Sequence, residues 1–156
     1  FFEHRAMLDG AWARRPYPGD DFVVPFGVAR RLRAGRELTL LSWGAMVERC
    51  EQAAAESLID VDLLDLRTLV PWDRKAVLAS VRTTHRCLIV HEDNMTAGFG
   101  AEIAACVAKE AFFSMDAPIE RLAMPDIPSP HSPRLLAAAV PGVESITPAI
   151  QQIASV

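Results

Sequence analysis

Hydrophobic runs of strand length alternate with helical patterns along the chain, and this alternation constrains the fold more than any other feature. The runs cover residues 38–43, 61–66, 87–91 and 119–124. The first is nearly continuous in apolar residues, as in strands buried on both faces of a parallel sheet. Strand–helix–strand units join parallel strands through right-handed crossovers. The sequence therefore predicts an α/β protein, a three-layer α/β/α sandwich around a mostly parallel sheet.

Helices are expected in the segments between these strands and after the last one. They are predicted at about 45–57, 73–81 and 100–113, then as a short helix opened by Ser132 and Pro133, and as a closing helix opened by Ser145 or Thr147 with Pro148. Asp73 and Ser132 are expected as N-caps, because short polar side chains accept hydrogen bonds from the free N–H groups of a first turn. Pro133 then suits the first helical position.

Two segments precede this pattern. Residues 28–33 read as a short strand whose three arginines suit a sheet edge. Residues 5–26 are punctuated by glycine and proline, which predicts an irregular interdomain linker. We expect four aromatic side chains to anchor that linker on a surface: Trp12, Tyr17, Phe22 and Phe26. The chain begins without Met, and we interpret it as a fragment of a longer protein.

Composition limits the classes of partner. The 156 residues suffice for one compact domain, and 51% of them are hydrophobic. A net charge of −4 without a basic run argues against nucleic acid and anionic membranes as partners. No apolar run reaches the ~18 residues that a membrane span needs. Three cysteines without a CxxC motif favour a reduced, cytoplasmic chain with buried thiols.

Three motifs lie at or just after the carboxyl ends of predicted strands, at the edge where open α/β sheets bind ligands. Gly98 and Gly100 could form part of a phosphate cradle at a helix N-terminus, but a glycine pair more often lets a turn pack closely. Asp65 and Arg67 place an acid near a cation, and we interpret them as a structural pair that fixes the end of a strand. The run from His91 to Asp93 has the side chains of a metal or acid–base site, but consecutive strand residues point to opposite faces, so the three cannot converge on one ion.

Several of these segments, in order, resemble one family. They are VPFGVARRLRAG at 24–35, LTLLSWGAMV at 38–47, DLRTLVPWD at 65–73, VHEDNMTAGFGAEIAA at 90–105, and the stretch from Ala117 to Pro130. They resemble the C-terminal domain of the β subunit of thiamine-diphosphate-dependent 2-oxo acid dehydrogenases, the E1 components of these complexes. Trp72 is most like the branched-chain type, whereas Ala97 stands where the family usually has Gly.

The resemblance implies a transketolase C-terminal domain-like fold over residues 27–156, with residues 1–26 as the end of a preceding domain, including a strand at 1–5, and the linker. It implies a mixed five-stranded sheet with one antiparallel edge strand. The complete E1 oxidatively decarboxylates a 2-oxo acid, here of branched-chain type, and acylates the lipoyl group of the E2 acyltransferase. It uses thiamine diphosphate and Mg, but the motifs that hold them are not in this fragment, for which no cofactor, no metal and no activity of its own are expected.

The implied role of the fragment is assembly. Its implied partners are the E1 α part, a second β copy in a homodimer, and the subunit-binding domain of E2. Arg5 resembles an arginine that contacts substrate near the same junction in transketolases, although an arginine at such a place is more often a plain linker residue. Arg67, His91 and Glu92 are the other candidates for a substrate-side or a structural role.

Two other hypotheses remain open from the residues. One is a stand-alone nucleotide- or CoA-binding module with flavodoxin-like topology. The other is a response-regulator-like domain, which needs an acidic cluster after its first strand; Trp43 and Gly44 do not supply one.

Overall fold

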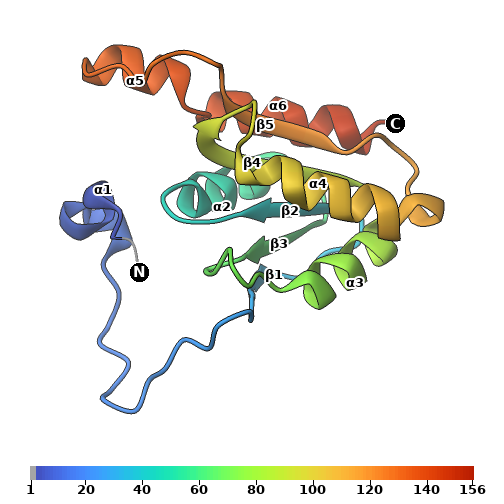
Figure 1. Ribbon diagram of the computed structural model, residues 1–156, viewed down its shortest axis with the longest axis horizontal. Coiled ribbons are helices and arrows are strands. Elements are labelled where there is room, and N and C mark those ends of the chain that lie inside the picture. The colour runs from blue at the N-terminus through green and yellow to red at the C-terminus, as the bar shows by residue number, and fades with distance from the viewer. Residues whose placement is uncertain (1–2) are drawn as a thin grey trace.

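A mixed five-stranded sheet forms the middle layer of the computed structural model, which describes residues 3–156 (Figure 1). The strand order is β1-β3-β2-β4-β5. The strands are β1 (Arg30–Arg33), β2 (Leu38–Ser42), β3 (Val61–Asp65), β4 (Cys87–Asn94) and β5 (Glu120–Met124). β1 pairs with β3 in antiparallel fashion, while the other three pairings are parallel. The predicted fold class and the antiparallel edge strand are confirmed.

Two helices cover each face of the sheet. α2 (Met46–Glu56) and α6 (Val143–Ala154) pack on one face, and α3 (Arg74–Thr84) and α4 (Phe99–Glu110) on the other (Figure 1). All five residues of β2 are buried, because this central strand has helices on both sides. Side chains of β2 point alternately into the hydrophobic cores on the two faces of the sheet. Leu38 and Leu40 face α2 and α6, whereas Leu41 faces α3 and α4.

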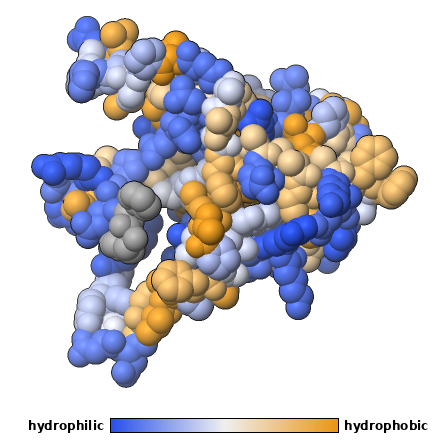
Figure 2. Space-filling model, in the orientation of Figure 1, coloured by the Kyte–Doolittle hydropathy of each residue, from blue (hydrophilic) through white to orange (hydrophobic). Residues whose placement is uncertain are grey.

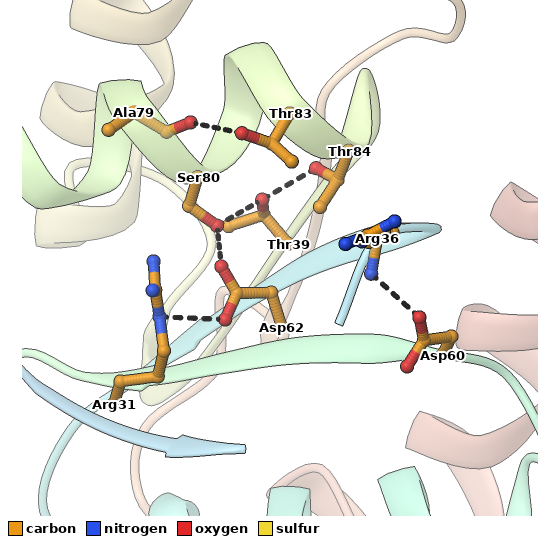
Figure 3. Close-up of polar contacts among 9 residues, drawn as sticks. All are labelled: Arg31, Arg36, Thr39, Asp60, Asp62, Ala79, Ser80, Thr83 and Thr84. Carbon is orange, nitrogen blue, oxygen red and sulfur yellow. Dashed lines mark hydrogen bonds and ion pairs between the residues drawn. The ribbon is translucent and has the colours of Figure 1, made fainter. Parts of the chain in front are cut away.

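A chain of polar side chains connects the edge strand with α3 (Figure 3). Arg31 of β1 forms an ion pair with Asp62 of β3, at 2.9 Å between Nε and Oδ1. The other Asp62 carboxylate oxygen accepts a hydrogen bond from Ser80 Oγ at 2.6 Å. Thr39 of β2 then lies between the hydroxyls of Ser80 and Thr84, at 2.6 and 2.7 Å. The hydrogen bonds pair the buried hydroxyls and one carboxylate oxygen on the α3 side of the sheet, and the ion pair with Arg31 offsets the charge of Asp62.

The segment before the sheet differs from the prediction. A helix α1 (Arg5–Asp9) and a 3₁₀ turn η1 (Ala11–Ala13) form where irregular chain was expected. The predicted strand at 1–5 lies partly outside the described residues, and its last residue begins α1. A helix satisfies its own backbone groups, whereas a lone strand needs a partner. Of the expected aromatic anchors, Tyr17, Phe22 and Phe26 are 77%, 57% and 83% exposed, whereas Trp12 is 37% exposed and lies against the cleft described below.

Several element ends also differ from the prediction. α6 begins at Val143, two residues before Ser145, because Ser145 is the third helical residue. Its Oγ accepts a hydrogen bond from the backbone N–H of Gly142 at 3.1 Å, and its own backbone N–H donates to the Gly142 carbonyl at 3.0 Å. Pro148 therefore lies inside the helix rather than at its start. β4 runs on to Asn94, and α3 continues to Thr84, where His85 ends it in a left-handed conformation. The short elements η2 (Phe112–Ser114) and α5 (Pro133–Ala139) follow α4 and precede α6.

Candidate functional site

The strand order creates one point at which a ligand site is expected. From β2 the chain moves to β3 on one side, and from β4 it moves to β5 on the other side. The carboxyl ends of β2 and β4 are therefore neighbours whose following helices lie on opposite faces of the sheet. Open α/β sheets bind ligands at such a topological switch point.

A cleft of about 840 Å³ opens at this point. Its walls come from α1, η1, the start of α2, the ends of β4 and β5, and α5. In Figure 2 the surface is hollowed on the left between the lobes of α5 and α1. The volume lies within the range of small-molecule sites. Apolar lining residues include Trp12, Met46, Met124, Leu136 and Val140; charged or titratable ones are His4, Glu48, Arg49, Glu92 and Asp93.

Glu92 is the predicted residue that reaches this cleft. It lies near the end of β4, and its Oε1 is 2.8 Å from Nε2 of His4 in the lead-in segment. On the α2 wall, Arg49 donates a hydrogen bond from Nη1 to the carbonyl of Pro141 at 2.7 Å. Glu92 and Arg49, two of the charged groups in the cleft, thus bind residues of neighbouring walls.

His91 lies on the opposite face of the sheet from Glu92. Its ring stacks on Trp43, with centroids 5.3 Å apart and an interplanar angle of 10°, and Phe99 meets Trp43 edge-on. A methyl group on Gly98 would lie 2.7 Å from the ring carbon Cε1, and one on Gly100 would lie 2.5 Å from Nε2. The two glycines therefore give room to the imidazole, and the close packing expected of this pair is observed.

The imidazole of His91 is fully buried, and both of its ring nitrogens lack a hydrogen-bond partner. Burial lowers the pKa of His91, and the nearby Arg121 lowers it too, whereas Asp93 acts in the opposite direction. The ring is therefore neutral at physiological pH.

Arg67 fixes the end of β3. Its backbone N–H donates to Asp65 Oδ1 at 3.0 Å, and its Nη2 donates to the carbonyl of Val28 at 2.8 Å. Arg67 has a positive φ of 56°, a conformation that such a local side-chain acceptor stabilises. Burial raises the pKa of Asp65, which the hydrogen bond from Arg67 and the positive charges of Arg67 and Arg30 oppose.

The four candidate residues do not form one site. Arg5 is exposed on α1, Arg67 is at the end of β3, and His91 and Glu92 face opposite sides of the sheet. Sequence reasoning missed His4, Trp12 and Arg49 as cleft residues. It also missed Trp43 as the partner of His91, although a tryptophan that directly follows a buried strand was a usable signal.

The described residues provide few reactive groups. Burial raises the pKa of the Cys50 and Cys87 thiols to about 12, so both remain protonated. All three cysteines are free. Within residues 3–156, no group of three His, Cys, Asp or Glu side chains is placed to hold a metal ion. In the same range, no helix is both long and apolar enough to cross a bilayer.

Solved structures define the class of fold. A structure titled as a split gene transketolase, inactive beta4 tetramer, matches with a TM-score of 0.73 at 20% identity, covering 88% of this chain and 44% of that one. A 2-oxoglutarate:ferredoxin oxidoreductase from Magnetococcus marinus matches with a TM-score of 0.53 at 9% identity, over 81% of this chain and 19% of that one. Both likenesses show the fold alone, an α/β domain of the transketolase C-terminal type.

The family follows from sequence. Residues 27–146 match the family model described as "Transketolase, C-terminal domain", and the chain belongs to this family. A 2-oxoisovalerate dehydrogenase subunit beta 2 from Arabidopsis thaliana is 43% identical over 116 residues, which cover 72% of this chain and 32% of that protein. The corresponding beta subunit from Bacillus subtilis is 32% identical, over 99% of this chain and 48% of that protein.

A pyruvate dehydrogenase E1 component subunit beta from Rhizobium meliloti is 39% identical over 137 residues, which cover 86% of this chain and 30% of that protein. The chain thus spans between about a third and a half of the length of these relatives. They confirm the predicted resemblance to E1 β subunits.

Proposed function

We propose that this chain is the C-terminal assembly domain of the E1 component of a 2-oxo acid dehydrogenase complex. The family match over residues 27–146, together with relatives that are E1 β subunits, carries this proposal. The complete enzyme would decarboxylate a 2-oxo acid oxidatively and acylate the lipoyl group of E2. The Trp72 motif and the 43% identical 2-oxoisovalerate dehydrogenase subunit favour a branched-chain substrate.

The residues of this domain do not fit thiamine diphosphate and Mg. A Mg-bound diphosphate needs carboxylate or carbonyl ligands for the ion and donors for the phosphates. The described chain offers no cluster of three metal-binding side chains. The N-terminus of α4 is filled by the His91 ring, which lies against Gly98 and Gly100. We therefore assign the cofactor to other parts of the complete enzyme.

The partners proposed are the E1 α part, a second copy of the β subunit and the subunit-binding domain of E2. Phe112 and Phe113, which follow α4, offer an apolar contact for such a role. They are 66% and 99% exposed, and their rings meet edge to face at 5.2 Å. Aromatic side chains are enriched at protein interfaces. The free thiols agree with the cytoplasm as the proposed location.

The cleft favours this proposal over a nucleotide- or CoA-binding module. Nucleotides and CoA carry several negative charges, which are bound by arginines, lysines or uncapped helix N-termini. The cleft instead presents the carboxylates of Glu48, Glu92 and Asp93, while Arg49 is hydrogen-bonded to Pro141. A polyanion would meet like charges there.

Calorimetric titration with thiamine diphosphate and Mg tests whether this domain binds the cofactor. We expect no binding heat at micromolar concentrations and no decarboxylation of branched-chain 2-oxo acids by this chain alone. Micromolar binding of the cofactor would contradict the assignment of this domain to assembly. Titration of the same chain with an E1 α subunit is the matched comparison. Binding between the two proteins does not require a thiamine diphosphate site in this domain.

A further inference from the structure

The slot that holds His91 gives neither ring nitrogen a well-formed hydrogen bond. Both ring nitrogens are buried without partners, and a neutral imidazole needs only one donor and one acceptor position. The Trp43 indole covers one face of the ring, and Gly98 and Gly100 lie against its edge. A protonated ring would be a buried cation whose N–H groups have no well-formed hydrogen bonds in this arrangement, which disfavours the charged form.

The charged groups that act on this ring come from two elements. Asp93, on the same strand, favours the protonated ring, and Arg121 of β5 opposes it. The contacts from the turn after β2 and from the start of α4 are made by Trp43, Gly98 and Gly100, none of which is charged. Burial, the largest of these influences, disfavours a proton on the imidazole inside the slot, and a ring that leaves the slot for solvent escapes this penalty.

We propose that His91 is an acid-sensitive latch that closes the corner between β4 and α4. The neutral ring fills the space between Trp43 and the glycine pair, and protonation expels it and loosens the turn at 94–98. That turn is otherwise tied to the loop after β5, where Asp126 accepts hydrogen bonds from the backbone N–H and the hydroxyl of Thr96, at 2.9 and 2.5 Å. The latch thus acts at the carboxyl edge of the sheet, beside the strand end that bears Glu92.

The direction of the pH effect follows from the lowered pKa of His91. The closed state binds the proton less readily than the open state, whose histidine has an ordinary pKa of about 6.5. Closure is therefore fully favoured above that pH and weakens as the pH falls below it. One proton changes the ratio of open to closed states by at most about tenfold per pH unit.

The emission of Trp43 and the resonances of the His91 ring test the latch. In a Trp12→Phe/Trp72→Phe background, Trp43 is the only remaining tryptophan. We expect its emission to change between pH 7 and 5 with a slope of one proton, while the far-ultraviolet circular dichroism stays constant. His91→Phe keeps an aromatic ring but cannot titrate, so this transition should be absent. His131→Gln, a change in an exposed loop, should leave it unaltered.

The unsubstituted protein gives an independent readout if His91→Phe does not fold. Nitrogen-15 spectra of the imidazole rings distinguish neutral from protonated histidine, and there are four rings to assign. We expect the His91 ring to stay neutral for as long as Trp43 keeps its native emission. A ring that protonates at or above pH 6.5 with that emission retained would overturn the proposal. So would a transition of the same size in His91→Phe.

Discussion

Gly100 is the residue whose replacement most directly tests the packing around His91. It lies at the second position of α4, where alanine would ordinarily favour the helix by up to about 1 kcal/mol. Here, however, a methyl group would lie 2.5 Å from Nε2 of a fully buried ring. The ring cannot easily move aside, because Trp43 stacks on it. Steric overlap should therefore outweigh helix propensity.

We expect Gly100→Ala to lower the free energy of unfolding by about 1–2 kcal/mol, since overpacking of a core costs about 1–3 kcal/mol and the helix recovers part of this. Urea unfolding followed by circular dichroism measures the change as a shift of the midpoint.

The control for Gly100→Ala is the same change in a protein that already carries His91→Ala. With the imidazole absent, the added methyl group has space, and the cost should fall below about 0.5 kcal/mol. An equal cost in both backgrounds would show that Gly100 is required for a reason unrelated to His91.

At the scale of elements, Asp73 joins the start of α3 to the chain that enters β1. Its Oδ1 accepts a hydrogen bond from the backbone N–H of Ala76 at 3.0 Å, as predicted for an N-cap. Its Oδ2 accepts another from the backbone N–H of Ala29 at 2.9 Å. The second bond spans 44 residues and helps to hold the antiparallel edge strand, whose remaining neighbour is β3 alone.

Asp73→Ala should therefore destabilise the protein by about 2 kcal/mol, the upper end of the range for N-caps. Ser132→Ala is the matched comparison, because Ser132 stands at the N-cap of α5 without a side-chain cap hydrogen bond and is exposed. Ser132→Ala should change the free energy of unfolding by no more than about 0.5 kcal/mol. Thermal or urea unfolding of the two variants measures the difference, and similar losses would contradict the account of Asp73.

The strands were predictable because burial on both faces leaves a continuous apolar run, as in β2. The edge strand was predictable from its arginines. The start of α6 was not, because a Ser with a nearby Pro also marks a helix start. Only the hydrogen bonds between Ser145 and the backbone of Gly142 show that Ser145 lies in the first turn. The helix α1 was missed because glycine and proline dominate the segment that surrounds it.

At the scale of the whole molecule, the cleft could not be predicted from sequence. Its walls come from segments between His4 and Val140 that are far apart in the chain, and α5 and α1 are short elements with weak sequence signals. What the sequence did indicate was the edge of the sheet, since the turns after β2 and β4 follow parallel strands. The side-chain period of two in a strand also separated His91 from Glu92.

The proposed association of two copies of this domain also concerns the whole molecule. We propose a two-fold pair, in which one surface meets itself and each contact occurs twice. About 800 Å² from each copy would suffice for a stable dimer. The exposed Phe112 and Phe113 lie next to α4, the helix whose surroundings we expect to form this contact. The alternative is that α4 buries one face on its own sheet and that water covers the other, where Lys109 is exposed.

Sedimentation equilibrium at concentrations up to high micromolar tests the central claim, that this domain provides subunit association. We predict a reversible monomer–dimer equilibrium for the natural sequence. A Phe112→Ser/Phe113→Ser variant should raise the dissociation constant at least about tenfold, because aromatic anchors dominate interface energies. Lys109→Ala should have little effect. A strictly monomeric protein throughout this range would contradict the proposal that this surface supports self-association.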